Sequence, residues 1–237
     1  MLELPQGTTV AGVASAISEG LRRNALAGKV NGKLVDLSYA LNDDAEVVIV
    51  TAKDPEALNI YRHTCAHVLA QAVKSIYPTC SLAIGPTIDT GFYYDIDFKT
   101  PITMDDLPKI EEEMKKIIKA DLAIERFELP REDAVALMKK YKEPYKVQLI
   151  KELPEDSVIS FYKQGDFTDL CRGPHLPSTG LIKAFKLTSI AGAYWRGNEK
   201  NKMLTRIYGT AFFKKADMEA YFTMLEEAKK RDHVKLS

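Results

Sequence analysis

Short apolar runs alternate with turn residues over about the first 50 positions, a pattern typical of a small β-rich domain. Leu2 and Leu4 suggest a short first strand. Turn and capping residues at 7–9 precede apolar residues at helical spacing: Val10, Val13, Ala14 and Ile17. Asn31-Gly32 predicts a two-residue hairpin turn, and residues 46–51 (EVVIVT) predict a strand. Strand, helix, hairpin and closing strand together predict a β-grasp, ubiquitin-like domain over residues 1–53.

Residues 54–214 alternate helical and strand patterns and predict a larger α+β domain, in which helices flank an antiparallel sheet. The pattern predicts helices over residues 55–77, 103–119 and 131–141, and strands over residues 158–162, 181–189 and 203–213. Residues 215–232 form a last amphipathic helical pattern that ends in charged residues. We therefore expect residues 215–237 to be a linker helix that leads into a further part of a longer protein.

Composition narrows the class of protein only a little. Hydrophobic residues make up 46% of the 237 positions, enough for one or two buried cores. Three cysteines, an odd and sparse number, indicate a reduced, cytosolic protein. The first residues lack the basic and apolar regions of a signal peptide, and no apolar run is long enough to span a membrane.

Two segments concentrate the residue types of acid–base and metal chemistry. His63 and His67 are four positions apart, so a helix would bring them to one face, about 5–6 Å apart at Cβ. Cys171 and His175 lie in a segment with Gly and Pro (DLCRGPH) that predicts a shaped turn. Three of the four histidines fall in these two motifs. We therefore expect the motifs to form one site.

The residue types leave the chemistry of that site open. The four side chains could hold zinc tetrahedrally or form a metal-free acid–base cluster. Cys171 could instead be a nucleophile with His67 or His175 as its base, although hydrolysis of an ester needs only a positioned water. An isolated histidine pair is more often structural, but two such motifs in one domain disfavour that interpretation. A zinc protease is disfavoured because Thr64 follows His63 where its motif has Glu.

Basic and aromatic residues gather near the end of the α+β domain. Residues 181–216 hold eight Lys or Arg but one acid, Glu199, although the whole chain balances 33 basic against 33 acidic residues. Basic groups neutralise phosphates and aromatic rings stack on unpaired bases, so this stretch predicts an RNA-binding face. Each aromatic residue singly is more often part of a core. The candidate substrate contacts are Tyr194, Trp195, Arg196, Lys202 and Arg206.

Four ordered motifs carry a resemblance to a known family: RHTCAHVLAQAV, AIGPTIDTGFYYD, DLCRGPHLPSTG and AGAYWRGNEKNKMLTRIYGTA. Together they resemble the editing domain of bacterial threonyl-tRNA synthetases. The leading residues resemble the TGS domain that precedes it, and the last residues resemble the helix that leads into the synthetase core. The resemblance covers essentially the whole chain. A related editing domain in alanyl-tRNA synthetases and free-standing alanyl editing proteins has the same His and Cys pattern and uses zinc.

The resemblance implies roles for individual residues. His63, His67, Cys171 and His175 would line the editing pocket. Lys146, in EPYKVQL, and Asp169 match further polar residues of that pocket. Tyr94, in GFYYD, would lie beside the terminal adenosine or the seryl group. The threonyl family is thought to edit without a metal, so the resemblance implies no cofactor for this site.

The function implied by the resemblance is proofreading. Such a hydrolase would release serine from the 3′ end of mischarged threonine tRNA and spare threonine. A missing methyl group is worth only ~1–3 kcal/mol of discrimination in a binding pocket, so a second, editing site is physically useful. A zinc-dependent alanyl-type editing enzyme and a non-enzymatic tRNA-binding module are the alternatives.

The class II core and the anticodon-binding domain of the family are not matched by this sequence. Aminoacylation, together with the ATP and zinc that belong to that core, is therefore not expected of this chain. The core forms the dimer in the family, so we expect this chain to be a monomer and the full-length enzyme to be a cytoplasmic homodimer. We expect the chain to be either part of a longer enzyme or a short editing protein.

Overall fold

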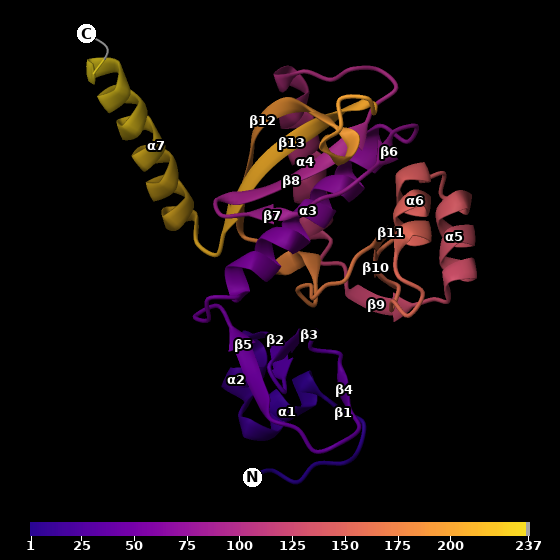
Figure 1. The fold of residues 1–237 in the computed structure, drawn as a ribbon. Coiled ribbons are helices and arrows are strands. Elements are labelled where there is room, and N and C mark those ends of the chain that lie inside the picture. The colour runs from indigo at the N-terminus through magenta and orange to yellow at the C-terminus, as the bar shows by residue number, and fades with distance from the viewer. Residues whose placement is uncertain (236–237) are drawn as a thin grey trace.

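A computed structural model describes residues 1–235 (Figure 1). The predicted α+β class with an N-terminal β-grasp domain is confirmed. The N-terminal domain contains β1 (Thr8–Thr9), α1 (Val10–Ile17), α2 (Glu19–Asn24), β2 (Ala25–Val30), β3 (Lys33–Val35), β4 (Ala40–Leu41) and β5 (Val47–Thr51). The Thr9 hydroxyl caps α1 by accepting a hydrogen bond from the Gly12 N–H. The strand expected at Leu2 and Leu4 is wrong, because both residues are exposed coil without an apolar partner layer.

The N-terminal domain has a core of its own. Antiparallel strands in the order β3-β2-β5 form its sheet, and Asn31 and Gly32 make the β2–β3 turn with positive φ. That turn is the predicted two-residue hairpin, in which Asn and Gly tolerate the left-handed backbone. The helix α1 packs on the sheet through buried apolar residues: Val10, Ala14, Ala25, Val35 and Leu37.

The larger domain begins with α3 (Ala57–Ile76), a helix buried along most of its length. It lies beneath an antiparallel five-stranded sheet, in the order β12-β13-β8-β6 with β7 paired to β8 (Figure 1). The bounds are β6 (Ser81–Leu82), β7 (Thr87–Ile88), β8 (Gly91–Asp97), β12 (Ala184–Tyr194) and β13 (Met203–Phe212). The amphipathic α4 (Leu107–Lys119) packs beside α3. This helix is the one predicted over residues 103–119.

A second, smaller lobe carries the remaining elements. Its antiparallel sheet, in the order β11-β10-β9, consists of β9 (Ile124–Glu128), β10 (Ser160–Gln164) and β11 (Phe167–Leu170). The helices α5 (Arg131–Lys140) and α6 (Pro144–Glu152) cover that sheet through a separate apolar cluster: Ala134, Met138, Ile150, Ile159 and Phe161. The pattern analysis predicted α5 and β10, but it missed α6, β8, β9 and β11.

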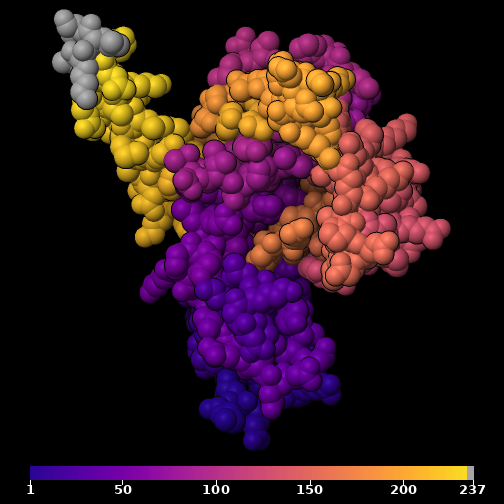
Figure 2. Space-filling model, in the orientation of Figure 1, coloured from indigo at the N-terminus to yellow at the C-terminus, as the bar shows by residue number. Residues whose placement is uncertain are grey.

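The chain continues from the main sheet into α7 (Lys215–Lys235), which projects away from the body (Figure 2). The helix expected over residues 215–237 is present as far as residue 235, and its role as a linker stays a prediction; residues 236–237 lie outside the described residues. Within residues 1–235, no helix is long and apolar enough to cross a membrane.

Candidate active site

The two chemical motifs meet at the middle of α3. His63 and His67 lie on one face of this helix, with ring centroids 5.0 Å apart. The His175 ring lies 4.8 Å from that of His63 and 4.4 Å from that of His67. Cys171 Sγ lies 2.9 Å from His63 Nε2 and 3.3 Å from His175 Nε2. The predicted convergence of the four side chains therefore exists in the fold.

Hydrogen bonds between its backbone and neighbouring residues hold the turn at Cys171–His175 in place. The Cys171 N–H donates to the Ser160 carbonyl at 3.1 Å, and the Ser160 hydroxyl donates back to the Cys171 carbonyl at 2.5 Å. The Leu176 N–H donates to the Thr64 hydroxyl at 3.0 Å, which links the turn to α3. Gly173 has a φ of 74°, and a Cβ there would lie 1.8 Å from the Tyr162 hydroxyl. The turn consequently requires glycine at this position.

A layer of buried polar groups lies behind the histidines. Lys146 Nζ lies 3.0 Å from Asp169 Oδ1 and donates to the Tyr94 hydroxyl at 2.9 Å. The Tyr94 hydroxyl donates to Asp169 Oδ2 at 2.6 Å, and His67 Nδ1 lies 3.5 Å from the same oxygen. Lys146, Asp169 and Tyr94 are almost completely buried. The carboxylate favours the His67 tautomer with its proton on Nδ1, because that proton faces a negative charge.

Burial keeps the four cluster side chains neutral. Loss of solvent lowers the pKa of His63 to about 4 and lowers those of His67 and His175 well below the ordinary value. Burial also raises the pKa of the Cys171 thiol to about 12. At neutral pH the site thus holds neutral imidazoles and a thiol. His63 and Cys171 are the partly exposed members of the cluster, whereas His67 and His175 are buried.

The cluster also fits the donor set of a zinc site. The four donor atoms lie within 4.8 Å of one another. Around tetrahedral zinc, nitrogen and sulfur ligands would be roughly 3.5 Å apart. The contact of 2.9 Å between His63 and Cys171 is shorter than that, so this pair would have to move apart by several tenths of an ångström. His63, His67, Cys171 and His175 would hold the ion, which would supply Lewis acidity.

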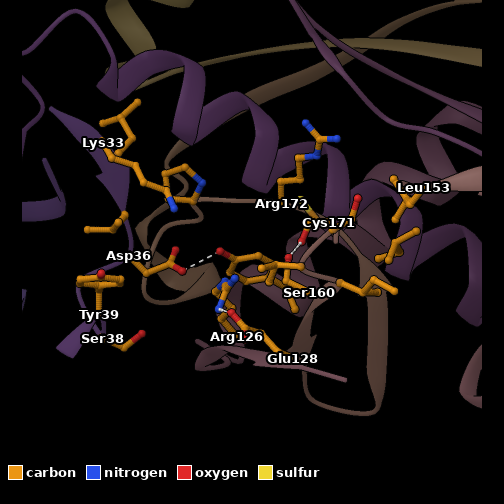
Figure 3. A pocket seen from close by; sticks show the side chains of 18 of the residues that line it. Lys33, Asp36, Ser38, Tyr39, Arg126, Glu128, Leu153, Ser160, Cys171 and Arg172 are labelled. Carbon is orange, nitrogen blue, oxygen red and sulfur yellow. Dashed lines mark hydrogen bonds and ion pairs between the residues drawn. The ribbon is translucent and has the colours of Figure 1, made fainter. Parts of the chain in front are cut away.

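A cavity of about 820 Å³ separates the N-terminal domain from the smaller lobe, and its size is that of a small-ligand pocket (Figure 3). Lys33, Asp36 and Tyr39 lie on one side of it, and Arg172 lies near Cys171 on the other. The cavity reaches the cluster at Cys171, whereas the three histidines do not line it. The site is therefore adjacent to this cavity rather than enclosed by it.

The basic stretch carries less unpaired charge than its sequence indicates, although most of its Lys and Arg residues are exposed. Arg206 makes a bidentate contact with Asp95 at 2.8 and 2.9 Å, and Lys202 lies 2.9 Å from Asp97. Acids distant in sequence from residues 181–216 thus neutralise some of the basic groups. Two further basic residues pair in the same way, Arg196 with Glu152 and Lys186 with Glu111.

The aromatic candidates divide between surface and core. Tyr194 is exposed on β12, as a stacking residue would be. Trp195 is buried, and its Nε1 donates to Gln148 Oε1 at 3.2 Å while its ring packs 4.9 Å from that of Tyr145. Trp195 therefore fastens the β12–β13 connection to α6, the helix that carries Lys146. Its predicted contact with substrate remains a prediction.

Three side chains that hydrogen-bond the turn were not predicted: Asp36, Thr64 and Ser160. Thr64 lies inside the His63–His67 motif, which is the one local signal that would have indicated it. No neighbouring residue in the sequence indicates a role for Asp36 or Ser160, because each hydrogen-bonds a segment more than ten positions away.

Two parts of the chain match known domain families. Residues 1–51 match the TGS domain, and residues 159–208 match the threonyl and alanyl tRNA synthetase second additional domain. The chain thus joins a TGS domain to a tRNA synthetase second additional domain, as its fold and site also indicate. Over its whole length it is homologous to threonine–tRNA ligases, which confirms the resemblance that its motifs carry.

The relatives are close in sequence but longer. Threonine–tRNA ligase of Acetivibrio thermocellus is 62% identical over 234 residues, covering 99% of this chain and 37% of the relative. That of Clostridium tetani is 58% identical over 236 residues, covering 100% of this chain and 37% of the relative. That of Anoxybacillus flavithermus is 55% identical over 234 residues, covering 99% and 36%. The chain thus spans little more than a third of the length of these curated relatives.

Proposed function

We propose that this chain is a proofreading hydrolase that removes serine from mischarged threonine tRNA. The observation that carries the proposal is the convergence of His63, His67, Cys171 and His175 in front of the buried Lys146–Asp169 pair. A surface that only binds RNA does not require a neutral imidazole cluster next to a buried ammonium group. Homology to threonine–tRNA ligases supports a tRNA as the partner, and threonine tRNA as the particular tRNA.

In this proposal His63 activates the attacking water, directly or through a hydroxyl of the terminal ribose. His63 is the partly exposed histidine of the cluster, and its neutral imidazole can accept a proton. Water attack on the seryl carbonyl places negative charge on the carbonyl oxygen. Lys146 is the nearby ammonium group that can stabilise this charge or orient the water, while Asp169 fixes its position.

Cys171 acts in this proposal as a hydrogen-bonding group and not as the nucleophile. A thiol whose pKa is raised to about 12 is almost entirely protonated at neutral pH, and the thiol form is a poor nucleophile. Its sulfur lies between two imidazole nitrogens, so the thiol can accept a hydrogen bond from one ring and donate a hydrogen bond to the other. The thiol thereby orients His63 and His175 relative to each other.

We propose that the reaction proceeds without a metal. The Lys146 ammonium group, buried behind the cluster, already supplies a positive charge that can stabilise an oxyanion, which is the role that a metal ion would otherwise take. The short contact between His63 and Cys171 also favours a hydrogen-bonded cluster over a ligand shell. Zinc held by the same four residues, as the alanyl branch of the family uses, is the second candidate, because the donor set fits it.

The test is to follow ester loss from seryl and threonyl threonine tRNA, each carrying a radiolabelled amino acid, with and without a strong chelator. The metal content of the purified chain is measured in parallel. Selective loss of serine that the chelator leaves unchanged is the expected result. Loss that stops with the chelator and returns with zinc would favour the zinc site. Binding of tRNA with no hydrolysis of either ester would overturn the assignment as a hydrolase.

A further inference from the structure

A carboxylate from the N-terminal domain reaches the candidate active site. Asp36 follows β3 and is buried at the boundary with the smaller lobe (Figure 3). Its Oδ1 accepts the backbone N–H of His175 at 2.8 Å, and its Oδ2 accepts the Tyr162 hydroxyl at 2.6 Å. One side chain of the N-terminal domain thus contacts both the backbone of a cluster residue and the strand β10 beside it.

These two hydrogen bonds bear directly on the position of the His175 ring. The centroids of the Tyr162 and His175 rings lie 4.1 Å apart. Asp36 therefore holds both the main chain of His175 and the tyrosine ring that packs against the histidine ring. Within the described residues, His175 Nδ1 is a buried atom with no hydrogen-bond partner. The ring is therefore placed by its backbone, by packing and by its contact with Cys171, rather than by a bond at Nδ1.

We propose that Asp36 is a positioning residue for the editing site, so that the N-terminal domain is a working part of this site. The proposal rests on the proposed function of the cluster. Without Asp36, the His175 N–H and the Tyr162 hydroxyl would lose their acceptors in a buried place, and the turn would shift to find others. A displacement of about 1 Å in a catalytic group costs on the order of 100-fold in rate.

Other contacts hold the N-terminal domain in place independently of Asp36. Leu26, Ala27 and Val50 belong to the same apolar cluster as residues of α3. Lys29 also forms an ion pair with Glu56, immediately before α3. The loss of Asp36 should therefore leave the domain docked. Lys29→Ala is a matched control, since it removes a charged contact between the two domains that does not involve the turn.

The experiment compares four variants of the full chain with the wild type: Asp36→Ala, Asp36→Asn, Tyr162→Phe and Lys29→Ala. Hydrolysis of seryl threonine tRNA is measured over a range of tRNA concentrations to separate kcat from KM. Alkylation of Cys171 by iodoacetamide, followed by peptide mass mapping, reports the order of the turn without any reaction at the ester. The buried Cys65 and Cys80 serve as internal references.

We expect Asp36→Ala to lower kcat by about 10- to 100-fold with KM within about twofold, because Asp36 acts through His175 and not on the tRNA. Cys171 should be alkylated several times faster than in the wild type. Asp36→Asn keeps an oxygen for the His175 N–H and should stay within about threefold of the wild type. Tyr162→Phe should give an intermediate loss, and Lys29→Ala should change neither readout.

Other results would overturn the role of Asp36. An unchanged kcat and an unchanged alkylation rate in Asp36→Ala would do so, as would a rise in KM alone, which would make Asp36 a substrate contact. Equal losses in Lys29→Ala would mean that docking, and not this carboxylate, matters. If Asp36→Ala does not fold, Tyr162→Phe decides the question: an intermediate loss of kcat with faster alkylation supports the role, and two unchanged readouts overturn it. If the wild type hydrolyses nothing, the proposed function fails, while the alkylation rates still test the positioning.

Discussion

His63 Nε2 lies 2.9 Å from Cys171 Sγ, although 108 positions separate these residues in the chain. The contact joins α3 to the turn after β11, and it places an imidazole and a thiol, both neutral, at the partly exposed edge of the cluster. This protonation state differs from that of a cysteine hydrolase, in which a thiolate faces an imidazolium. The pair is therefore suited to orienting a water molecule.

His63→Ala should lower the rate of seryl ester hydrolysis by at least about 100-fold, the usual contribution of a general base. The melting temperature should change little, because His63 is partly exposed on α3. Steady-state hydrolysis and a thermal melt measure the two effects. His233→Ala is a matched control, since this exposed histidine of α7 lies outside the cluster. Full activity in His63→Ala would contradict its role.

Cys171→Ala should keep hydrolysis within about tenfold of the wild-type rate, because the thiol orients neighbouring groups and forms no bond to the substrate. Removal of a true nucleophile costs roughly 10⁴-fold or more. Rapid-quench measurements with labelled serine would detect a seryl-enzyme thioester if one formed. Accumulation of that thioester, together with an inactive alanine variant, would restore the cysteine-nucleophile interpretation.

Lys146→Met should destabilise the chain by about 3–5 kcal/mol, since it leaves Asp169 buried without its cation. The double variant Lys146→Met, Asp169→Leu should recover a large part of that stability, because no uncompensated charge remains. Both variants should fail to hydrolyse the ester. Urea unfolding monitored by circular dichroism gives the stabilities. A double variant as unstable as the single one would show that the pair contributes stability beyond charge compensation.

Stability should fall as pH decreases below about 6.5. The three cluster histidines have folded-state pKa values below the ordinary 6.5, so the unfolded chain binds more protons between the folded and unfolded values. Each histidine then costs up to about 1.4 kcal/mol per pH unit in that window. Asp36 and Glu143, whose pKa values are raised by burial, act in the opposite direction at lower pH.

Urea unfolding at pH 7.5, 6.5 and 5.5 measures this dependence. His67→Asn should flatten it, because one of the buried imidazoles is removed. A stability that does not vary over this range would mean that the cluster is hydrated in solution, since contact with water would remove the penalty for burial.

Arg206 and Lys200 should respond differently to substitution. Arg206→Ala removes the bidentate partner of the buried Asp95 and should cost roughly 2 kcal/mol of stability. Lys200 is exposed in the β12–β13 connection, so Lys200→Ala should leave the stability unchanged. Lys200→Ala should instead weaken tRNA binding and reduce the slope of log K for tRNA binding against log salt concentration by about 1. Filter binding at several salt concentrations distinguishes the two residues. Equal losses of tRNA binding in both variants would support the predicted contact of Arg206 with the tRNA.

Local pattern was a good guide where an element has one apolar face. The stripe of α4 and the run of residues 203–212 on β13 were predicted close to their observed bounds. The pattern missed α6, β8 and β11, and these three elements supply Lys146, Tyr94 and Asp169. Each places a polar residue in the interior, and a buried ion pair interrupts the apolar periodicity on which prediction depends. For those residues only the family resemblance indicated a site.

The sequence by itself determined the α+β class, the leading β-grasp domain and the two short motifs in which the site chemistry lies. These features depend on neighbours within a few positions, where helical spacing and turn residues act directly. The tertiary structure alone decided that Cys171 contacts His63 directly within the predicted site, that Asp36 hydrogen-bonds His175, and that Asp95 neutralises Arg206. Such pairs are set by packing between distant segments. Burial also shifts pKa values through loss of solvent, which no stretch of sequence contains.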